Sequence, residues 1–170
     1  MTSPGLLETT IGVMRRPNTF FGGTPGRWSD VHPAVYAVIV TGVPLCVALA
    51  IVGEGRDAPD YVLLFFAVGF ASLVSAGLAT LCAHTFVRAA GGAPRSLAET
   101  FSCVCYCQAP MVLLVVPLLG CALAPLWSCV ALTIGLRKLH GVSTAIAVGA
   151  AVVAQGAEVG LAVGLWYGSV

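Results

Sequence analysis

The sequence places one carboxyl group inside a long apolar segment, and this is its clearest chemical feature. Glu158 lies in the segment that runs from Ser143 to the Trp166-Tyr167 pair. Gln155 lies three residues earlier, so on a helix the two side chains project from one face. Ionisable groups inside a membrane are costly and often functional. The pair predicts either a proton or cation relay, or a structural hydrogen bond or water-lined groove.

Cysteine and histidine are the other residues with ligand chemistry. The seven cysteines all lie in apolar runs: Cys46, Cys82, Cys103, Cys105, Cys107, Cys121 and Cys129. On a helix only Cys103 and Cys107 of the alternating trio face the same way. Structural zinc takes four ligands, usually in paired C-x-x-C spacing, so we expect no metal and no cofactor. We interpret the cysteines as small apolar fillers, with a redox role as a distant alternative. His84 and His140 fall at predicted helix ends, where capping or snorkelling is expected.

The usual signatures of enzymes are missing from the sequence. It has no G-x-S-x-G, H-E-x-x-H, P-loop or G-x-G-x-x-G pattern. It also shows no nucleophile–base pair and no paired carboxylates, so we predict that it is not an enzyme. A net charge of +1, without a basic patch interleaved with aromatics, argues against nucleic-acid binding.

Composition indicates which elements must position these residues. Of the 170 residues, 58% are hydrophobic and only 9% are charged, whereas soluble domains carry about 25% charged residues. Only helices or closed barrels satisfy their backbone polar groups in lipid. A barrel needs short alternating segments, and this chain has long unbroken apolar runs. The predicted fold is therefore an all-α polytopic membrane bundle.

About five membrane-embedded helices are expected, over residues 35–52, 61–86, 102–117, 120–136 and from 143 to the end. Residues 102–136 contain no charge, and one helix of that length would measure about 52 Å. The hydrocarbon core is only about 30 Å thick. We therefore expect a turn marked by Pro117, Gly120 and Pro125, with either two spanning helices or a re-entrant hairpin.

Residues 1–34 are predicted to form a cytoplasmic segment ahead of a membrane domain over residues 35–170. Ser3 and Pro4 suit a helix start, and the apolar residues from Leu6 to Met14 share one arc. Such an amphipathic helix is typical of the membrane interface. Pro17 is expected to end it.

The basic residues predict the orientation, because short cytoplasmic loops are rich in Lys and Arg. Only Arg56 falls on one side of the bundle. Seven residues fall on the other: Arg15, Arg16, Arg27, Arg88, Arg95, Arg137 and Lys138. We expect the N-terminus in the cytoplasm and the C-terminus outside, and both arrangements of residues 102–136 give this result.

Two stripes of small residues predict helix packing. The second helix carries Ala67, Ala71, Ser75, Ala79 and Ala83 at four-residue spacing. The last helix carries Gly156, Gly160, Gly164 and Gly168, opposite Glu158 and Gln155. Small residues let helix backbones approach closely. The partner of the glycine stripe is either another helix of this chain or a second copy.

Several short motifs occur in a recognisable order. They are Arg16-Pro17-Asn18-Thr19-Phe20-Phe21, His84 and Arg88 before Gly91-Gly92, Glu99-Thr100, Cys105-Tyr106 with Ala109-Pro110, Leu119-Gly120, Trp127, Ile134-Gly135-Leu136, and His140-Gly141-Val142-Ser143-Thr144. Over about residues 12–150 this order resembles the prokaryotic branch of the Yip (Ypt/Rab-interacting protein) membrane family. The resemblance implies a five-helix domain with a cytoplasmic N-terminus.

Within that resemblance the motif residues have structural roles. Pro17, Phe20 and Phe21 are expected to pin the N-terminal segment to the interface. Pro110 is expected to kink the third helix, and Tyr106 or Gln108 to satisfy the groups that the kink frees. His140 and Gly141 are expected to end the fourth helix, with Ser143 opening the fifth.

These features predict a membrane scaffold or membrane-organising protein that acts by helix packing and oligomerisation. Its expected partners are the lipid bilayer and a second copy or other membrane proteins. Eukaryotic Yip proteins are linked to Rab GTPases, but this chain lacks their long hydrophilic N-terminal region, so GTPase binding is not carried over. The alternative is a small transporter or channel component with a polar path at Gln155 and Glu158. The expected location is a prokaryotic plasma membrane, or the ER or Golgi membrane in a eukaryote.

Overall fold

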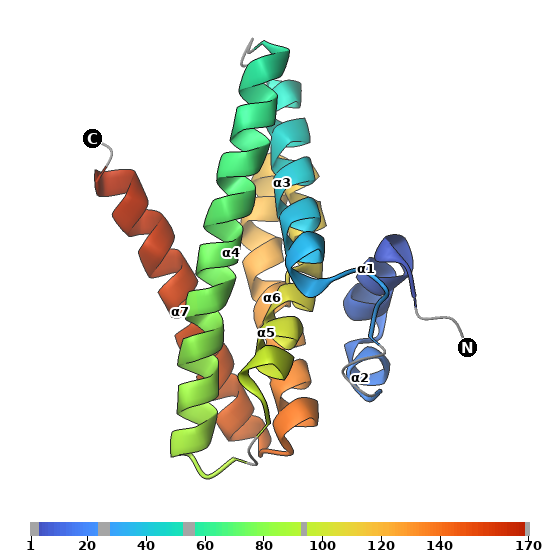
Figure 1. Cartoon of the computed structure of the whole chain (residues 1–170), viewed down its shortest axis with the longest axis vertical. Coiled ribbons are helices and arrows are strands. Elements are labelled where there is room, and N and C mark those ends of the chain that lie inside the picture. The colour runs from blue at the N-terminus through green and yellow to red at the C-terminus, as the bar shows by residue number, and fades with distance from the viewer. Residues whose placement is uncertain (1–3, 24–27, 53–56, 93–94, 169–170) are drawn as a thin grey trace.

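The computed structural model describes residues 4–23, 28–52, 57–92 and 95–168, and within these ranges it is built from helices without strands (Figure 1). Two short helices, α1 (Leu6–Arg15) and α2 (Pro17–Phe20), precede the bundle. The bundle consists of α3 (Pro33–Val52), α4 (Ala58–Ala89), α5 (Leu97–Tyr106), the 3₁₀ segment η2 (Ala109–Val115), α6 (Pro117–His140) and α7 (Thr144–Gly168).

Five segments of the described chain are long and apolar enough to cross a membrane. They correspond to α3, α4, α5 with η2, α6 and α7, which confirms the all-α, five-helix prediction. α4 has 32 residues, and at 1.5 Å per residue it measures about 48 Å. It therefore extends beyond a hydrocarbon core of about 30 Å. One end of α4 must continue into the polar region outside the lipid.

The third segment is interrupted where Pro110 was expected to kink it. α5 ends at Tyr106, and a 3₁₀ segment with Pro110 near its start continues to Val115. Proline lacks the N–H that an α-helix needs at this position. The segment also begins earlier than predicted, because Ser96 and Glu99 form a reciprocal capping box ahead of the apolar run.

The turn after this segment lies earlier than the sequence suggested. Val116 has an extended backbone and Pro117 is the first residue of α6, a position that suits proline. Gly120 and Pro125, predicted to mark the turn, lie inside α6. Gly120 is still required there, because a Cβ at this position would overlap the Leu113 backbone. Its role is to let η2 and α6 approach closely, rather than to make the turn.

The N-terminal segment packs against the bundle. Val13, Phe21 and Trp28 are buried in the same core as residues of α5 and α6. The Thr10 hydroxyl shares a 3.0 Å hydrogen bond with the hydroxyl of Tyr36 on α3. Gly5, rather than a serine, occupies the N-cap of α1, and Ser3 lies outside the described residues. Placement of α1 at a membrane interface stays a prediction.

The connections of the bundle gather at its two ends. In Figure 1 the C-termini of α4 and α6 and the N-termini of α5 and α7 lie at the lower end, while α3 and α4 are joined at the upper end. α7 crosses beside α4, and its C-terminal part lies apart from the other helices (Figure 1). This divergence leaves part of α7 without a neighbouring helix.

Candidate functional site

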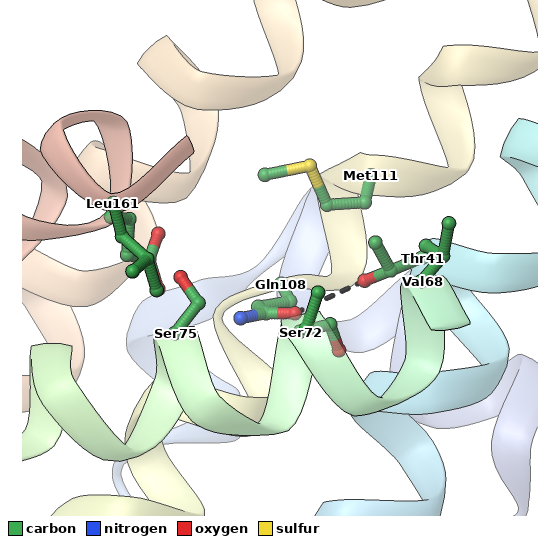
Figure 2. A pocket seen from close by; sticks show the side chains of 9 residues that line it. Thr41, Val68, Ser72, Ser75, Gln108, Met111 and Leu161 are labelled. Carbon is green, nitrogen blue, oxygen red and sulfur yellow. Dashed lines mark hydrogen bonds between the residues drawn. The ribbon is translucent and has the colours of Figure 1, made fainter. Parts of the chain in front are cut away.

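A pocket of about 240 Å³ lies among α3, α4, η2 and α7 (Figure 2). It is an open recess rather than a sealed cavity. Its lining residues are Thr41, Val68, Ala71, Ser72, Ser75, Gln108, Met111, Glu158 and Leu161. Most of the lining surface is apolar, so the few polar groups determine what chemistry it can support.

Glu158 brings a carboxyl group into this pocket from α7. Gln155 donates a hydrogen bond of 3.0 Å from Nε2 to Glu158 Oε2. The structure thus places the two residues together, as the three-residue spacing predicted. Glu158 Oε1 is buried and accepts no hydrogen bond from the described residues. One carboxyl oxygen is therefore satisfied within α7, and the other is not.

Gln108 faces the same carboxyl from the residue before η2. Its Oε1 accepts a 3.1 Å hydrogen bond from the Thr41 hydroxyl of α3, drawn as a dashed line in Figure 2. The Gln108 side chain also lies beside the Glu158 carboxyl. Even so, Glu158 Oε1 has no hydrogen-bond partner among the described residues. Gln108 thus links α3 to the pocket.

Two serines on α4 complete the polar lining. Ser72 is 8% exposed, and its hydroxyl has no hydrogen-bond partner among the described residues. The Ser75 hydroxyl points toward Leu161 in Figure 2. The Ser72 hydroxyl and Glu158 Oε1 are therefore two buried polar atoms beside the same pocket, and neither has a hydrogen-bond partner in the described chain. Burial of a polar atom without a hydrogen bond is destabilising.

Sequence reasoning identified only part of this set. Glu158 and Gln155 were found because a charge in an apolar run is conspicuous. Ser72 and Thr41 were missed, because hydroxyls are common in membrane helices and often bond to their own backbone. Gln108, an amide side chain within the long uncharged run, was the signal that could have extended the predicted site.

The two predicted helix-end histidines meet at a buried threonine instead of capping separately. The Thr100 hydroxyl lies 3.1 Å from His84 Nδ1 and 3.2 Å from His140 Nε2, and it also reaches the Ser96 carbonyl at 3.2 Å. This cluster joins α4, α5 and α6 at the lower end of the bundle. Gly141 follows with a φ of 63°, a left-handed conformation that ends α6 and favours glycine. Ser143 accepts a 3.4 Å hydrogen bond from the Ile146 amide at the start of α7.

The predicted aromatic anchors form a cluster against α5. Ring centroids lie 5.0 Å apart for Phe20 and Phe21, 6.0 Å for Phe20 and Tyr106, and 5.2 Å for Phe21 and Trp28. The Tyr106 hydroxyl donates to the Val31 carbonyl at 2.7 Å. The Tyr106 hydroxyl is thus committed to Val31, and Gln108 Oε1 accepts from Thr41. Tyr106 therefore connects α5 to the segment before α3, and Gln108 connects the start of η2 to α3. That one of these residues satisfies the groups freed at Pro110 stays a prediction.

The glycine stripe of α7 is not covered by another helix of the described chain. Gly156, Gly160 and Gly164 are exposed, and a Cβ added to any of them would meet no heavy atom within 4 Å. The fourth member, Gly168, ends α7. Within the described chain, therefore, no other helix packs against these three glycines, and a second copy as the partner of the stripe stays a prediction.

Three of the seven cysteines lie in the packed core, whereas Cys121 is exposed. Cys103, Cys105 and Cys107 are buried, and all seven cysteines are unpaired thiols. The Cys103 Sγ fills the space beside Gly135, where an added Cβ would lie 2.5 Å away. No three metal-ligating side chains come together within the described ranges.

A bundle of five apolar helices, each long enough to cross a membrane, defines an integral membrane protein of the helical class. Comparison with protein-family models matches residues 11–165 to the Yip1 domain. The chain therefore belongs to the Yip1 domain family, as the order of its motifs indicated. Separate searches of curated proteins and of solved structures found no match.

Proposed function

We propose that the protein is a non-enzymatic membrane scaffold that assembles with a second copy of itself through α7. The observation that carries this proposal is the uncovered glycine ridge formed by Gly156, Gly160 and Gly164. Four-residue spacing of small residues supports close approach of two helices in lipid, where packing and not hydrophobic exclusion drives association.

Glycines elsewhere in the bundle support this interpretation. An added Cβ would lie 2.8 Å from Phe65 at Gly42, 2.8 Å from Val38 at Gly69 and 2.8 Å from Phe86 at Gly149. In each case a side chain of a neighbouring helix fills the space. By this comparison, the open ridge on α7 is a packing surface whose partner lies outside the chain.

A second α7 is the partner that fits this ridge best. α7 diverges from the bundle on its C-terminal side (Figure 1), so a symmetry-related copy has access to it. In a two-fold dimer the same patch meets itself, and two glycine ridges permit close backbone contact. Lipid covers the remaining exposed apolar faces, such as that of Phe70 on α4, which is 71% exposed.

The test is the oligomeric state of the full chain in lipid nanodiscs or mild detergent. Gly160→Leu and Gly164→Leu fill the ridge without touching the intrachain core, and each is expected to weaken self-association by tenfold or more. Gly77→Leu is the matched control, because Gly77 on α4 also has no atom within 4 Å of an added Cβ. A wild-type chain that is monomeric at all protein-to-lipid ratios, or an oligomer that tolerates both α7 substitutions, contradicts the proposal.

The carboxyl group of Glu158 in this pocket favours a second candidate function, that of a small carrier or channel component. Here Glu158 and Gln155 would line the path of a proton or a small cation. Glu158→Gln removes the titratable group and keeps the shape, so it should abolish transport in proteoliposomes while leaving assembly unchanged. A scaffold should keep its assembly and its cellular phenotype with this substitution.

A further inference from the structure

The pocket contains two buried polar groups whose hydrogen-bonding needs the described chain does not meet. Glu158 Oε1 lacks a donor, and the Ser72 hydroxyl lacks any partner. Both residues line the same recess, from α7 and α4. Unmet buried polar groups of this kind are destabilising. Their presence together beside an open recess points to an occupant that supplies the missing hydrogen bonds.

The rest of the lining indicates an apolar body for that occupant. Val68, Ala71, Met111 and Leu161 contribute apolar side chains to the wall, and the polar part of the lining surface is small by comparison with the apolar part. At about 240 Å³ the pocket exceeds the roughly 30 Å³ that one water occupies. It is smaller than the roughly 300–1,000 Å³ of pockets that enclose a whole ligand. It therefore suits the head and first carbons of a longer molecule whose remainder lies in the lipid.

Hydrogen-bond complementarity selects the head group. A carboxylate or phosphate would set its acceptor oxygens against Glu158. An ammonium could donate to Glu158 and to the oxygen of a serine hydroxyl, but charged groups are costly to bring into a membrane. A hydroxyl donates one hydrogen bond and accepts others. Among these groups, it alone satisfies Glu158 Oε1 and a serine hydroxyl together without importing charge.

We propose that this pocket binds a neutral, membrane-dissolved amphiphile with a hydroxyl head, that is, a long-chain alcohol or a lipid with a free hydroxyl. The hydroxyl donates to Glu158 Oε1 and accepts from Ser72. The alkyl chain lies along Val68, Met111 and Leu161 and leaves through the open side of the pocket. This site shares no residue with the glycine ridge of Gly156, Gly160 and Gly164, so the two proposals can be tested separately.

The test uses photolabelling of the full chain in phosphatidylcholine nanodiscs. The probe is a long-chain alcohol with a diazirine near its hydroxyl, and its matched control is the same hydrocarbon without the hydroxyl. Peptides that contain residues 68–75 and 158–161 are expected to carry the alcohol label about tenfold more than the hydrocarbon label, the effect of one buried hydrogen bond. Excess hexadecanol should remove this labelling.

Substitutions separate the pocket from general lipid contact. Ser72→Ala and Glu158→Leu should each reduce labelling toward the hydrocarbon level, whereas Glu158→Gln should keep much of it because an acceptor oxygen remains. Ser128→Ala is the matched control, since Ser128 on α6 is also buried and unpartnered within the described chain but does not line this pocket. If Glu158→Leu fails to fold, Ser72→Ala still decides the outcome.

Equal labelling by the two probes overturns the proposal and identifies the pocket as a recess filled by water or lipid chains. Labelling that Ser72→Ala leaves unchanged, or that excess hexadecanol does not reduce, also overturns it. Neither result bears on the scaffold proposal, which is decided by the association of the Gly160→Leu and Gly164→Leu variants.

Discussion

At the scale of single residues, glycine sets how closely the helices of this protein approach. Gly135 on α6 is closely surrounded, and a Cβ there would lie 2.5 Å from Cys103 Sγ and 3.5 Å from the Phe21 ring. Gly135→Ala should lower the free energy of unfolding by about 1–3 kcal/mol, the usual range for overpacking. Thermal unfolding in detergent measures this change. Gly77→Ala, at an open site, should be neutral or slightly stabilising.

The same contact can be tested by compensation. Gly135→Ala adds a methyl group that would clash with the Cys103 sulfur, and Cys103→Ala removes that sulfur. The double variant should therefore recover most of the stability lost by Gly135→Ala. A double variant no more stable than the single one would mean that the loss arises elsewhere, for example at Phe21. Recovery would also support the interpretation of Cys103 as a packing residue.

Thr100 provides a second residue-scale prediction, because one hydroxyl serves three helices. It lies within 3.2 Å of both His84 Nδ1 and His140 Nε2 and is fully buried. Thr100→Val keeps the shape and removes these bonds, which should cost about 1–3 kcal/mol of unfolding free energy. Thr133→Val is the control, since the Thr133 hydroxyl donates to the Cys129 carbonyl of its own helix. Equal effects of the two substitutions would contradict a bridging role.

At the scale of elements, the N-terminal segment is the part whose placement depends most on tertiary contacts. Phe21 and Trp28 are each 2% exposed, and they belong to the buried core of the bundle rather than facing lipid. Phe21→Ala should release α1 and α2 from the bundle, and the loss of a buried phenylalanine is worth about 3–5 kcal/mol. Hydrogen exchange of residues 6–20 should accelerate strongly. Phe70→Ala, on the lipid-facing side of α4, should leave that exchange unchanged.

The existence of the helices was predictable from sequence, whereas their contacts were not. Long apolar runs in a charge-poor chain predict five helices, and Pro110 and Gly141 mark a break and an end through backbone chemistry alone. The start of α5 at Leu97 depends on the Ser96–Glu99 capping box, which lies outside the apolar run and was not used. Gly120 was misassigned to a turn because a glycine in close helix contact and a glycine in a turn look alike in sequence.

The candidate site was likewise predictable within one helix but not between helices. A carboxyl in an apolar run is visible without a structure, and its hydrogen bond to Gln155 follows from spacing on one helix. The contributions of Ser72, Gln108 and Thr41 come from three other parts of the chain. Their proximity depends on how the helices cross, which local periodicity does not encode.

At the scale of the whole molecule, the structure gathers basic residues at one end of the bundle. Arg88 lies in the last turn of α4, Arg95 precedes α5, and Arg137 and Lys138 lie in the last turn of α6. These connections share the lower end in Figure 1. Because Lys and Arg in short loops are retained in the cytoplasm, this end should face the cytosol. The junction between α3 and α4 should then face outward.

Reporter fusions test this orientation directly. Alkaline phosphatase, which is active only outside the cytoplasm, should be inactive when fused after Gly91 or after Gly141 and active when fused after Ala58. A cytosol-dependent fluorescent reporter at the same three sites should show the opposite pattern, which excludes poor expression as the cause. Opposite sides for Gly91 and Gly141 would mean that α5, η2 and α6 do not return the chain to its starting face, and the five-span arrangement would then fail. Reversal of all three sites would keep the arrangement but assign the basic end to the outer face.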